Sequence, residues 1–324
     1  MKVLFLSILL LFITIIVGLV TSFVEPFDTV VSKLENDAGF FSMLFFLLNH
    51  YIYCKKTHTS LKVDTSNWLF TYKLGWNDYF EDIDLSYNEG NEIHYVGHKS
   101  IIEEYPILEY KNYIHDFYKY NQKTKNAIDS IKSNLNLFNN YDSIFIRRGD
   151  KLGEESVLIT EEKYVDLLLH HNPFCSYIFL QTDDYNCYLN IKKYVETKQL
   201  DIRVETLCDK DSVGVIVHNR QREILNNASV HNEHNKDYLT SIKDKLNTTK
   251  AVEDMSPDEK YKHVMDMIIG IDILIHSNIC ITDYQSNVAR FIKLKHVSPE
   301  KVYDVNSPDK DIDYTKNICP AFSF

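Results

Sequence analysis

The sequence lacks an excess of positive charge, and it also lacks any cysteine spacing typical of a structural metal site. Among its 324 residues, 35 lysines and arginines stand against 46 aspartates and glutamates, so the formal net charge is −11. Such an acidic balance argues against a general nucleic-acid-binding protein. The six cysteines are widely separated and form no metal knuckle: Cys54, Cys175, Cys187, Cys208, Cys280 and Cys319.

Only one apolar run is long enough to cross a membrane, from Val3 to Val24. A bilayer core of ~30 Å requires about 20 such residues, and Lys2 ahead of the run favours a cytoplasmic N-terminus. Residues 1–24 are therefore predicted to be the signal-anchor of a single-pass type II membrane protein. The alternative is a signal peptide cleaved near residues 20–22. Both readings send the rest of the chain into the secretory pathway.

Two glycosylation acceptor triplets agree with a secretory location. Asn227-Ala228-Ser229 and Asn247-Thr248-Thr249 both match the N-x-S/T pattern, and both fall in one polar stretch. Disulfides are permitted in that compartment, but the spacing of the cysteines does not specify which of them would pair. The content of 44% hydrophobic and 25% charged residues is that of a globular protein.

The first half, residues 25–140, shows scattered secondary-structure signals. Gly39 forms a turn ahead of an apolar helix at about residues 40–53, and residues 60–64 alternate like a strand. A further helix is predicted around residues 127–135, from apolar residues that share one face. Residues 78–120 have no clear period, and no structure is predicted for them.

The second half, residues 141–324, alternates short apolar strands with helices, which predicts a parallel sheet covered on both faces. Residues 208–255 are rich in Asp, Asn, Lys and Ser and are predicted to be an inserted loop region. Ser256, with Pro257 and Glu259 behind it, marks a helix start. The predicted strands are residues 143–146, 177–180, 202–204 and 279–282, and the other predicted helices begin near Glu161, after Asp184 and at Ser286.

Polar side chains follow three of these strands, at the edge where parallel sheets bind their ligands. Arg147 and Arg148 follow the first strand, and two guanidinium groups there can hold a pyrophosphate bidentately. The alternative is a salt bridge to Asp183 or Asp184, at the end of the next strand. We favour the phosphate role because several hydrogen-bond donors converge on this edge.

Asp183 and Asp184 also suggest a metal site. A second interpretation is that one carboxylate caps the following helix while the other orients the arginines, and we prefer it because the arginines already neutralise a diphosphate. His231, with Glu233 and His234 near it, could likewise be drawn as metal ligands. That group lies in the polar stretch and is more simply read as solvated.

Two further groups lie near the same edge. Glu155 can serve as a general base if an acceptor hydroxyl lies against it, but its spacing alone favours the alternative, a solvated loop carboxylate. Ser286 and Asn287 are predicted at a helix N-terminus, where free N–H groups and the helix dipole favour anions. Ordinary N-capping explains Ser286 as well.

Together these segments resemble the α-1,6-fucosyltransferase family and its relatives, the rhizobial chitooligosaccharide fucosyltransferases. Residues 147–155, R-R-G-D-K-L-G-E-E, look like the first family motif, R-R-x-D-K-x-G-x-E, with Tyr164 at the matching distance. Residues 180–184 resemble the L-x-T-D-D segment, and residues 286–290 resemble the S-Q-V-x-R ending of the third motif. Residues 60–80 are similar to the N-W…G-W…F stretch. The likeness covers most of residues 37–295.

The resemblance implies a GT-B-like α/β fold with an acceptor-side lobe at residues 25–140 and a Rossmann-type donor lobe at 141–324. It implies inverting, metal-independent transfer of fucose from GDP-fucose to a glycan or glycoprotein hydroxyl, without a cofactor and in the Golgi lumen. The catalytic residues would be Glu155 as base, Lys151 and Asp150. The donor-binding residues would be Arg147, Arg148, Tyr164, Asp183, Asp184, Asp266, Ser286, Asn287 and Gly39.

The sequence departs from this family where guanine is held. Phe145 stands at the place of a family histidine, and Gly270 aligns with a family aspartate. Asp266, one turn away on the same helix face, is the residue predicted to replace that aspartate. Asn287 replaces a glutamine. These losses leave two alternatives open: an inactive relative that binds sugar nucleotide or glycan, and a transferase for another GDP-sugar.

Overall fold

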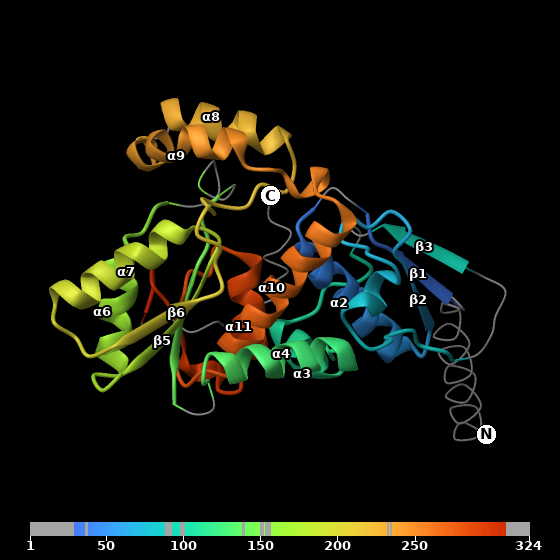
Figure 1. The fold of residues 1–324 in the computed structure, drawn as a ribbon. Coiled ribbons are helices and arrows are strands. Elements are labelled where there is room, and N and C mark those ends of the chain that lie inside the picture. The colour runs from blue at the N-terminus through green and yellow to red at the C-terminus, as the bar shows by residue number, and fades with distance from the viewer. Residues whose placement is uncertain are drawn as a thin grey trace, which may run out of the picture.

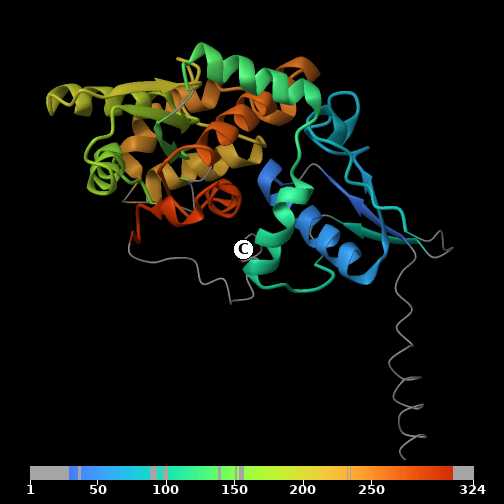
Figure 2. The same cartoon turned by 90° about the horizontal axis from the view of Figure 1, so that it is seen from below.

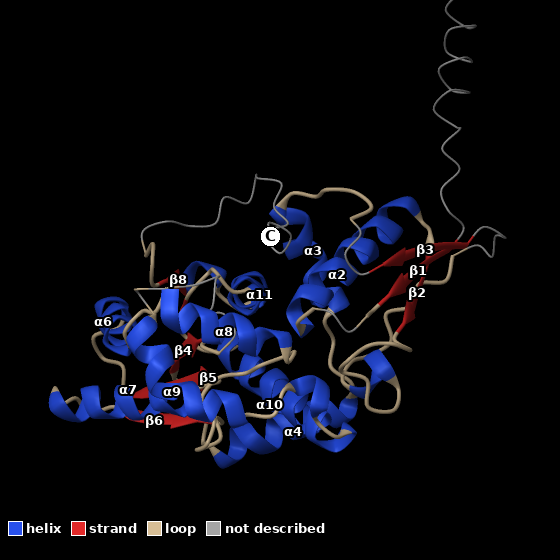
Figure 3. Cartoon of the chain, turned by 90° about the horizontal axis from the view of Figure 1, so that it is seen from above, coloured by secondary structure: helices blue, strands red, loops and turns tan. Residues whose placement is uncertain are grey.

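The structure is a computed structural model, and it describes residues 29–35, 38–87, 93–97, 101–137, 140–149, 152, 157–231, 233 and 235–308. These residues form two parallel sheets, each packed against helices (Figure 1). The smaller sheet belongs to the first half of the chain and the larger to the second. Figure 3 shows the two sets of strands well apart, with helices between them.

The smaller sheet has the strand order β2-β1-β3 and is parallel throughout. Its elements are β1 (Thr29–Lys33), α2 (Phe40–Thr57), β2 (Ser60–Asp64), the 3-10 helix η1 (Gly75–Asp78), β3 (Ile93–Gly97) and α3 (Ile107–Phe117). Helix α2 and β2 confirm the predicted elements. The central strand β1 was not predicted from sequence, and β3 and α3 fall where no prediction was made.

The larger sheet has the order β6-β5-β4-β7-β8, and all its strands are parallel. This confirms the predicted parallel sheet and adds β8, which was not predicted. Its strands are β4 (Asp142–Ile146), β5 (Tyr177–Thr182), β6 (Arg203–Thr206), β7 (Cys280–Thr282) and β8 (Val302–Asp304). Its helices and 3-10 helices are α4 (Gln122–Asn134), α6 (Glu161–His171), α7 (Tyr185–Thr197), η2 (Val252–Asp254), α10 (Pro257–Ile275), α11 (Asn287–Lys295) and η3 (Pro299–Lys301).

Side chains of β4 and β5 alternate between two hydrophobic clusters, as the period of two in a strand requires. Ile144 and Ile178 pack with α6 and α7, whereas Phe145 and Phe179 pack with α10 and α11. The sheet therefore has helices on both faces. Both predicted helix starts are confirmed: Ser256 forms a capping box with Glu259, and the Ser286 hydroxyl accepts a hydrogen bond from the Ala289 amide.

The predicted loop region at residues 208–255 is wrong in its main part. It contains two helices, α8 (Arg220–His231) and α9 (Lys236–Thr248), which lie side by side above the larger sheet (Figure 1). Their polar composition suggested a loop, but apolar residues spaced three and four apart on α9 give it a buried face. We call α8 and α9 together the helical hairpin. Its core contains Leu152, Val213, Ile216, Leu225, Leu239, Ile242, Leu246 and Ala251.

The predicted membrane anchor, residues 1–24, lies outside the described residues. Among the residues that the structure describes, no helix has the length and apolar character needed to cross a bilayer. The cysteines at 54, 175, 187, 208 and 280 are free thiols. Asn227 and Asn247, the predicted glycosylation acceptors, are both exposed on the helical hairpin.

One hydrophobic core joins the two halves of the chain. Phe291 on α11 packs against Phe41 on α2, with ring centroids 4.9 Å apart, and against Tyr118, with centroids 4.6 Å apart. Figure 2 shows α2 and α3 beside the helices that cover the larger sheet. The two halves are therefore held together by packed aromatic side chains.

Candidate functional site

The three strands that carry the predicted polar clusters are immediate neighbours. β4 lies between β5 and β7, with Ile146 opposite Thr182 and Ile144 opposite Ile281. Because all three strands are parallel, the residues that follow them share one edge of the sheet. The predicted convergence of the strand ends is thus confirmed.

Asp183 is the centre of this edge. One of its carboxylate oxygens accepts the Arg147 guanidinium and the Val215 amide, at 3.0 Å for the latter, and the other accepts the Arg148 backbone amide at 2.7 Å. The side chain of Asp183 is only 9% exposed, so its charge is compensated by these donors. The structure therefore contains the salt bridge that the sequence offers as the alternative role of Arg147, and Asp183 orients this arginine.

The two arginines diverge to opposite sides of the sheet. The Arg148 guanidinium turns toward α6, where it donates to the Ile159 carbonyl at 2.6 Å and to Glu161 at 2.8 Å. Arg148 is 2% exposed and Tyr164, beside it, is 1% exposed. Arg147 keeps 17% of its side chain exposed. In this arrangement the pair is not a side-by-side clamp, and Arg147 is the better placed to meet an anion.

The paired aspartates have separate tasks. Asp184 is fully buried and caps α7, accepting from the Asn186 amide at 2.9 Å. Burial raises the pKa of its carboxyl group. Thus one aspartate caps a helix and the other orients an arginine, as the preferred interpretation stated. Within the described ranges, no three His, Cys, Asp or Glu side chains are grouped closely enough to hold a metal ion.

Two helix N-termini meet near this edge. Ser286 caps α11, and the Asn287 amide donates to the Ser42 hydroxyl in the first turn of α2 at 2.8 Å. Gly39 is the N-cap residue of α2, and no side chain caps that helix. A Cβ added at Gly39 would meet nothing within 4 Å. Helix N-termini offer free N–H groups and a positive dipole, which favour an anion.

Phe145 and Asp266, the two residues predicted near guanine, both have partners within the protein. Phe145 is 6% exposed and belongs to the hydrophobic core. Asp266 forms an ion pair with Lys262 at 2.6 Å along the same helix, and burial raises the pKa of its carboxyl group. No contact of Asp266 with the strand ends is seen among the described residues. Its predicted role toward guanine stays a prediction.

His263 on α10 was missed by the sequence analysis. Burial and the nearby cations of Arg147 and Lys262 lower the pKa of its imidazole to about 4. It precedes Gly270 by seven residues and so lies on the same face of α10. The seven-residue spacing from Gly270 is the sequence signal that could have identified His263 as a site residue. His263 adds a neutral donor or acceptor on the α10 side of Arg147.

A close backbone crossing was missed as well. Gly149 has φ +60° and lies against residue 215, so that a Cβ there would come within 2.5 Å of the Val215 carbonyl oxygen. Gly214, at φ +120°, lies against Gly149 in turn. Only glycine fits such an approach without strain. The predicted catalytic residues that follow, Asp150, Lys151 and Glu155, lie outside the described residues.

Comparison with solved structures finds the same fold in fucosyltransferases. A NodZ α-1,6-fucosyltransferase soaked with GDP-fucose is 11% identical, with a TM-score of 0.53 over 88% of this chain and 98% of that one. The fucosyltransferase NodZ from Bradyrhizobium matches with a TM-score of 0.51, at 11% identity over 88% of this chain and 97% of that one. Arabidopsis thaliana FUT1, in a mutant complex with GDP, is 7% identical, with a TM-score of 0.50 over 91% of this chain and 73% of that one.

No protein-family model and no curated protein matches the chain in sequence. At such low identities the structural likeness concerns the fold. The α/β fold with parallel sheets, like that of GT-B fucosyltransferases, is confirmed.

Proposed function

We propose that the chain is a glycosyltransferase that moves fucose from GDP-fucose to a hydroxyl group of a glycan or glycoprotein. The observation that carries the proposal is the Arg147–Asp183 pair, which lies where the neighbouring strands β4 and β5 end, near the N-termini of α2 and α11. A cation held by a buried carboxylate beside helix N-termini suits a nucleoside diphosphate. The NodZ crystals soaked with GDP-fucose support this choice of donor.

The proposed reaction is an inverting displacement without a metal ion. The acceptor oxygen attacks the anomeric carbon, the bond from that carbon to the diphosphate oxygen breaks, and GDP leaves with the electron pair. Glu155 takes the acceptor proton, assisted by Lys151 and Asp150. Arg147 offsets the charge that grows on the leaving diphosphate. Arg148 and Tyr164 support the site from inside the protein.

The test is a transfer assay on the full chain purified in detergent. A panel of GDP-sugars is offered with glycan acceptors, and GDP affinity is measured by calorimetry. We expect GDP binding, transfer of fucose, and activity that survives EDTA. Activity that is lost in EDTA and restored by manganese would overturn metal independence. Transfer of another sugar alone would replace fucose as the substrate.

An inactive, sugar-nucleotide-binding relative is the second candidate. The observation that favours it is the loss of both family groups at the guanine position, where Phe145 is buried and Gly270 carries no side chain. The assay above separates the two candidates. Tight GDP binding with no transfer to any acceptor would support the inactive relative.

For the location, we propose a type II membrane protein of the Golgi, anchored by residues 1–24, with an acceptor-side lobe at 25–140 and a donor lobe at 141–324 in the lumen. Asn227 and Asn247 offer a direct test because both are exposed. In secretory cells, removing N-glycans should shift the mobility of the protein, and Asn227→Gln with Asn247→Gln should abolish that shift. Extraction by alkaline carbonate would contradict the anchor.

A further inference from the structure

Gln181 carries a polar group that the fold leaves without a partner. Its side chain extends from β5 toward α10, where the carboxamide lies against Gly270, in the space that a side chain at position 270 would fill. The carboxamide oxygen is buried and makes no hydrogen bond with any residue that the structure describes. An unsatisfied polar atom of this kind costs free energy in folding, which indicates a role outside the packing of the protein.

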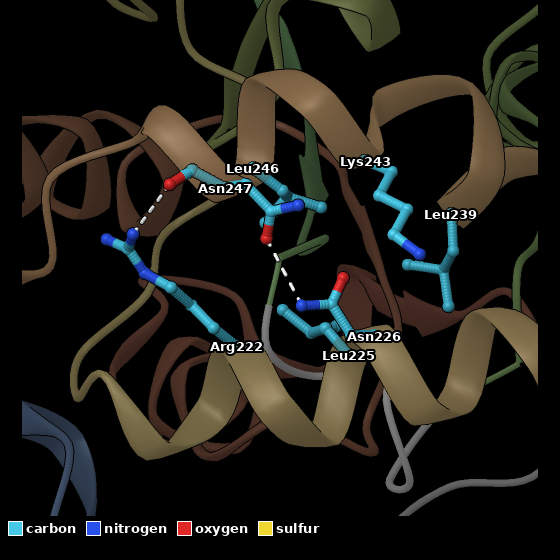
Figure 4. A pocket seen from close by; sticks show the side chains of 7 residues that line it. All are labelled: Arg222, Leu225, Asn226, Leu239, Lys243, Leu246 and Asn247. Atoms are coloured by element: carbon cyan, nitrogen blue, oxygen red, sulfur yellow. Dashed lines mark hydrogen bonds between the residues drawn. The ribbon is translucent and has the colours of Figure 1, made fainter.

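A carboxamide in the helical hairpin shows the contrast. The Asn226 amide on α8 donates to the Asn247 side chain at 3.2 Å, between the two helices (Figure 4). The cavity beside this pair holds only about 10 Å³, room for at most one water. Asn226 thus has a partner within the protein. For Gln181, the atom that is turned toward α10 lacks one whichever way the carboxamide is oriented.

Gln181 lies on the side of the larger sheet where the candidate donor site is. Its contact with Gly270 places it on the α10 side. Arg147 lies on that side as well, because its charge helps to lower the pKa of the His263 imidazole on α10 to about 4. Asp183, which holds Arg147, follows Gln181 by two residues, a span of about 7 Å along a strand. One nucleotide whose diphosphate is held by Arg147 can therefore extend to Gln181.

We propose that Gln181 binds the base of the donor nucleotide, its carboxamide oxygen accepting from N1–H of guanine and its carboxamide nitrogen donating to O6. The inference rests on the proposed function, which supplies GDP-fucose as the donor. Guanine presents this donor and this acceptor side by side, and a carboxamide has one acceptor and one donor to match them. Gln181 is only partly buried and its oxygen has no bond to lose, so the carboxamide can turn to a base without sacrificing an interaction.

The first test measures binding to Gln181→Leu, with Asn226→Leu as the matched control. Leucine has a similar size and no polar atom, so GDP affinity should fall about 10-fold in calorimetry, as expected for one or two lost hydrogen bonds. Inorganic pyrophosphate has no base and should bind Gln181→Leu and wild type equally. GDP affinity should be unchanged in Asn226→Leu. Equal GDP affinity in Gln181→Leu and wild type would overturn the proposal.

Stability separates a binding role of Gln181 from a packing role. Replacing an unpaired buried polar group by an apolar group of the same shape is neutral or stabilising. The Tm of Gln181→Leu should therefore equal or exceed that of wild type, although GDP affinity is lower. A fall in Tm with unchanged GDP affinity would make Gln181 a packing residue and contradict the base contact.

A second variant tests which edge of the base is bound. In Gln181→Glu, the carboxylate accepts from N1–H and from the 2-amino group of guanine but can no longer donate to O6. Inosine diphosphate lacks that amino group. The preference for GDP over inosine diphosphate should therefore be about 10-fold greater in Gln181→Glu than in wild type. The same preference in both proteins would show that Gln181 does not face this edge of the base.

These measurements distinguish failure of the inference from failure of the proposed function. A protein that binds GDP through Gln181 but transfers no sugar would keep the base contact and remove the transferase. A protein that transfers fucose, and whose Gln181→Leu variant has full GDP affinity, would keep the transferase and remove the base contact. A wild-type protein that does not bind GDP would remove both.

Discussion

Gln181 on β5 occupies the space that a side chain at position 270 of α10 would need. A methyl group added to Gly270 would overlap the Gln181 carboxamide. The Gln181 oxygen is buried and accepts no hydrogen bond from any residue that the structure describes. Gln181 is also the register neighbour of Phe145 on β4. The two departures from the fucosyltransferase pattern are therefore parts of one local packing arrangement.

The coupling of Gln181 and Gly270 can be measured by a double-mutant cycle. Replacing glycine by alanine within a helix ordinarily stabilises a protein by about 1 kcal/mol. In the wild-type background, the overlap with Gln181 should cancel this gain or reverse it. In a Gln181→Ala background, Gly270→Ala should give the full gain, measured by urea denaturation. Equal effects in the two backgrounds would contradict the packing described.

Arg147 is predicted to be the main phosphate contact. Arg147→Ala should weaken GDP binding by about 10- to 100-fold in calorimetry, because it removes a charge-assisted hydrogen bond worth about 1.5–3 kcal/mol. Arg203→Ala is the matched control. Arg203 is the first residue of β6, so it lies at the opposite end of the strands from Arg147, and it pairs with Glu205 in an exposed position. Equal GDP affinity in both variants would remove Arg147 from the donor site.

Arg148 is predicted to matter first for folding. Arg148→Ala leaves the Glu161 carboxylate, 11% exposed, without its main partner, which should cost about 3–5 kcal/mol in the free energy of unfolding. Arg148→Met combined with Glu161→Leu should recover a large part of that loss. Chemical denaturation measures both. A loss below about 1 kcal/mol, as expected for an exposed ion pair, would show that Arg148 is not a structural cation.

Glu155 separates an enzyme from a binding protein. Because a base acts when the proton moves, Glu155→Gln should leave GDP affinity unchanged and lower kcat by roughly 10²–10⁴-fold. Calorimetry and product formation measure the two quantities on the same preparation. The nearby Glu154→Gln serves as the control. Full activity in Glu155→Gln would exclude Glu155 as the base.

His263 should make stability depend on pH. Its pKa is lowered to about 4 by burial, Arg147 and Lys262, against the opposing charge of Asp209. Between about pH 6.5 and 4, the unfolded chain binds a proton that the folded chain does not, so stability falls as the pH falls. At pH 5 the loss is about 1–2 kcal/mol.

His263→Gln removes this titration, so the loss of unfolding free energy between pH 7 and pH 5 should be smaller by about 1–2 kcal/mol. His296, whose pKa is also lowered to about 4, titrates in both proteins, so its contribution cancels in the comparison. Unfolding at pH 7 and pH 5 gives the difference. Identical pH slopes for wild type and variant would show that His263 titrates normally.

Features that depend only on neighbouring residues were predicted from the sequence. The Ser256 capping box and the Ser286 cap were identified because each needs only neighbouring residues. The split roles of Asp183 and Asp184 were also predicted. The direction of Arg148 was not, because it depends on Glu161 and Ile159, which approach only when α6 packs on the sheet.

Elements defined by distant pairing were missed. β1 is short, and it is recognisable as a central strand only because β2 and β3 pair with it. The polar composition of the helical hairpin predicts a loop, although Leu239, Ile242 and Leu246 on α9 share one buried face. The side-chain amide of Asn235, just before α9, donates a hydrogen bond to the Leu152 carbonyl, 83 residues earlier in the chain. No local sequence pattern encodes such a contact.

The aromatic contacts of Phe291 limit how this chain can be divided. Phe41, Tyr118 and Phe291 belong to the same cluster as Phe145 and Phe179 of the larger sheet. A fragment that starts at residue 141 would leave Phe291 uncovered, and the first half alone would leave Phe41 uncovered. Chimeras that join one half of this chain to another protein would therefore have to carry these three rings along.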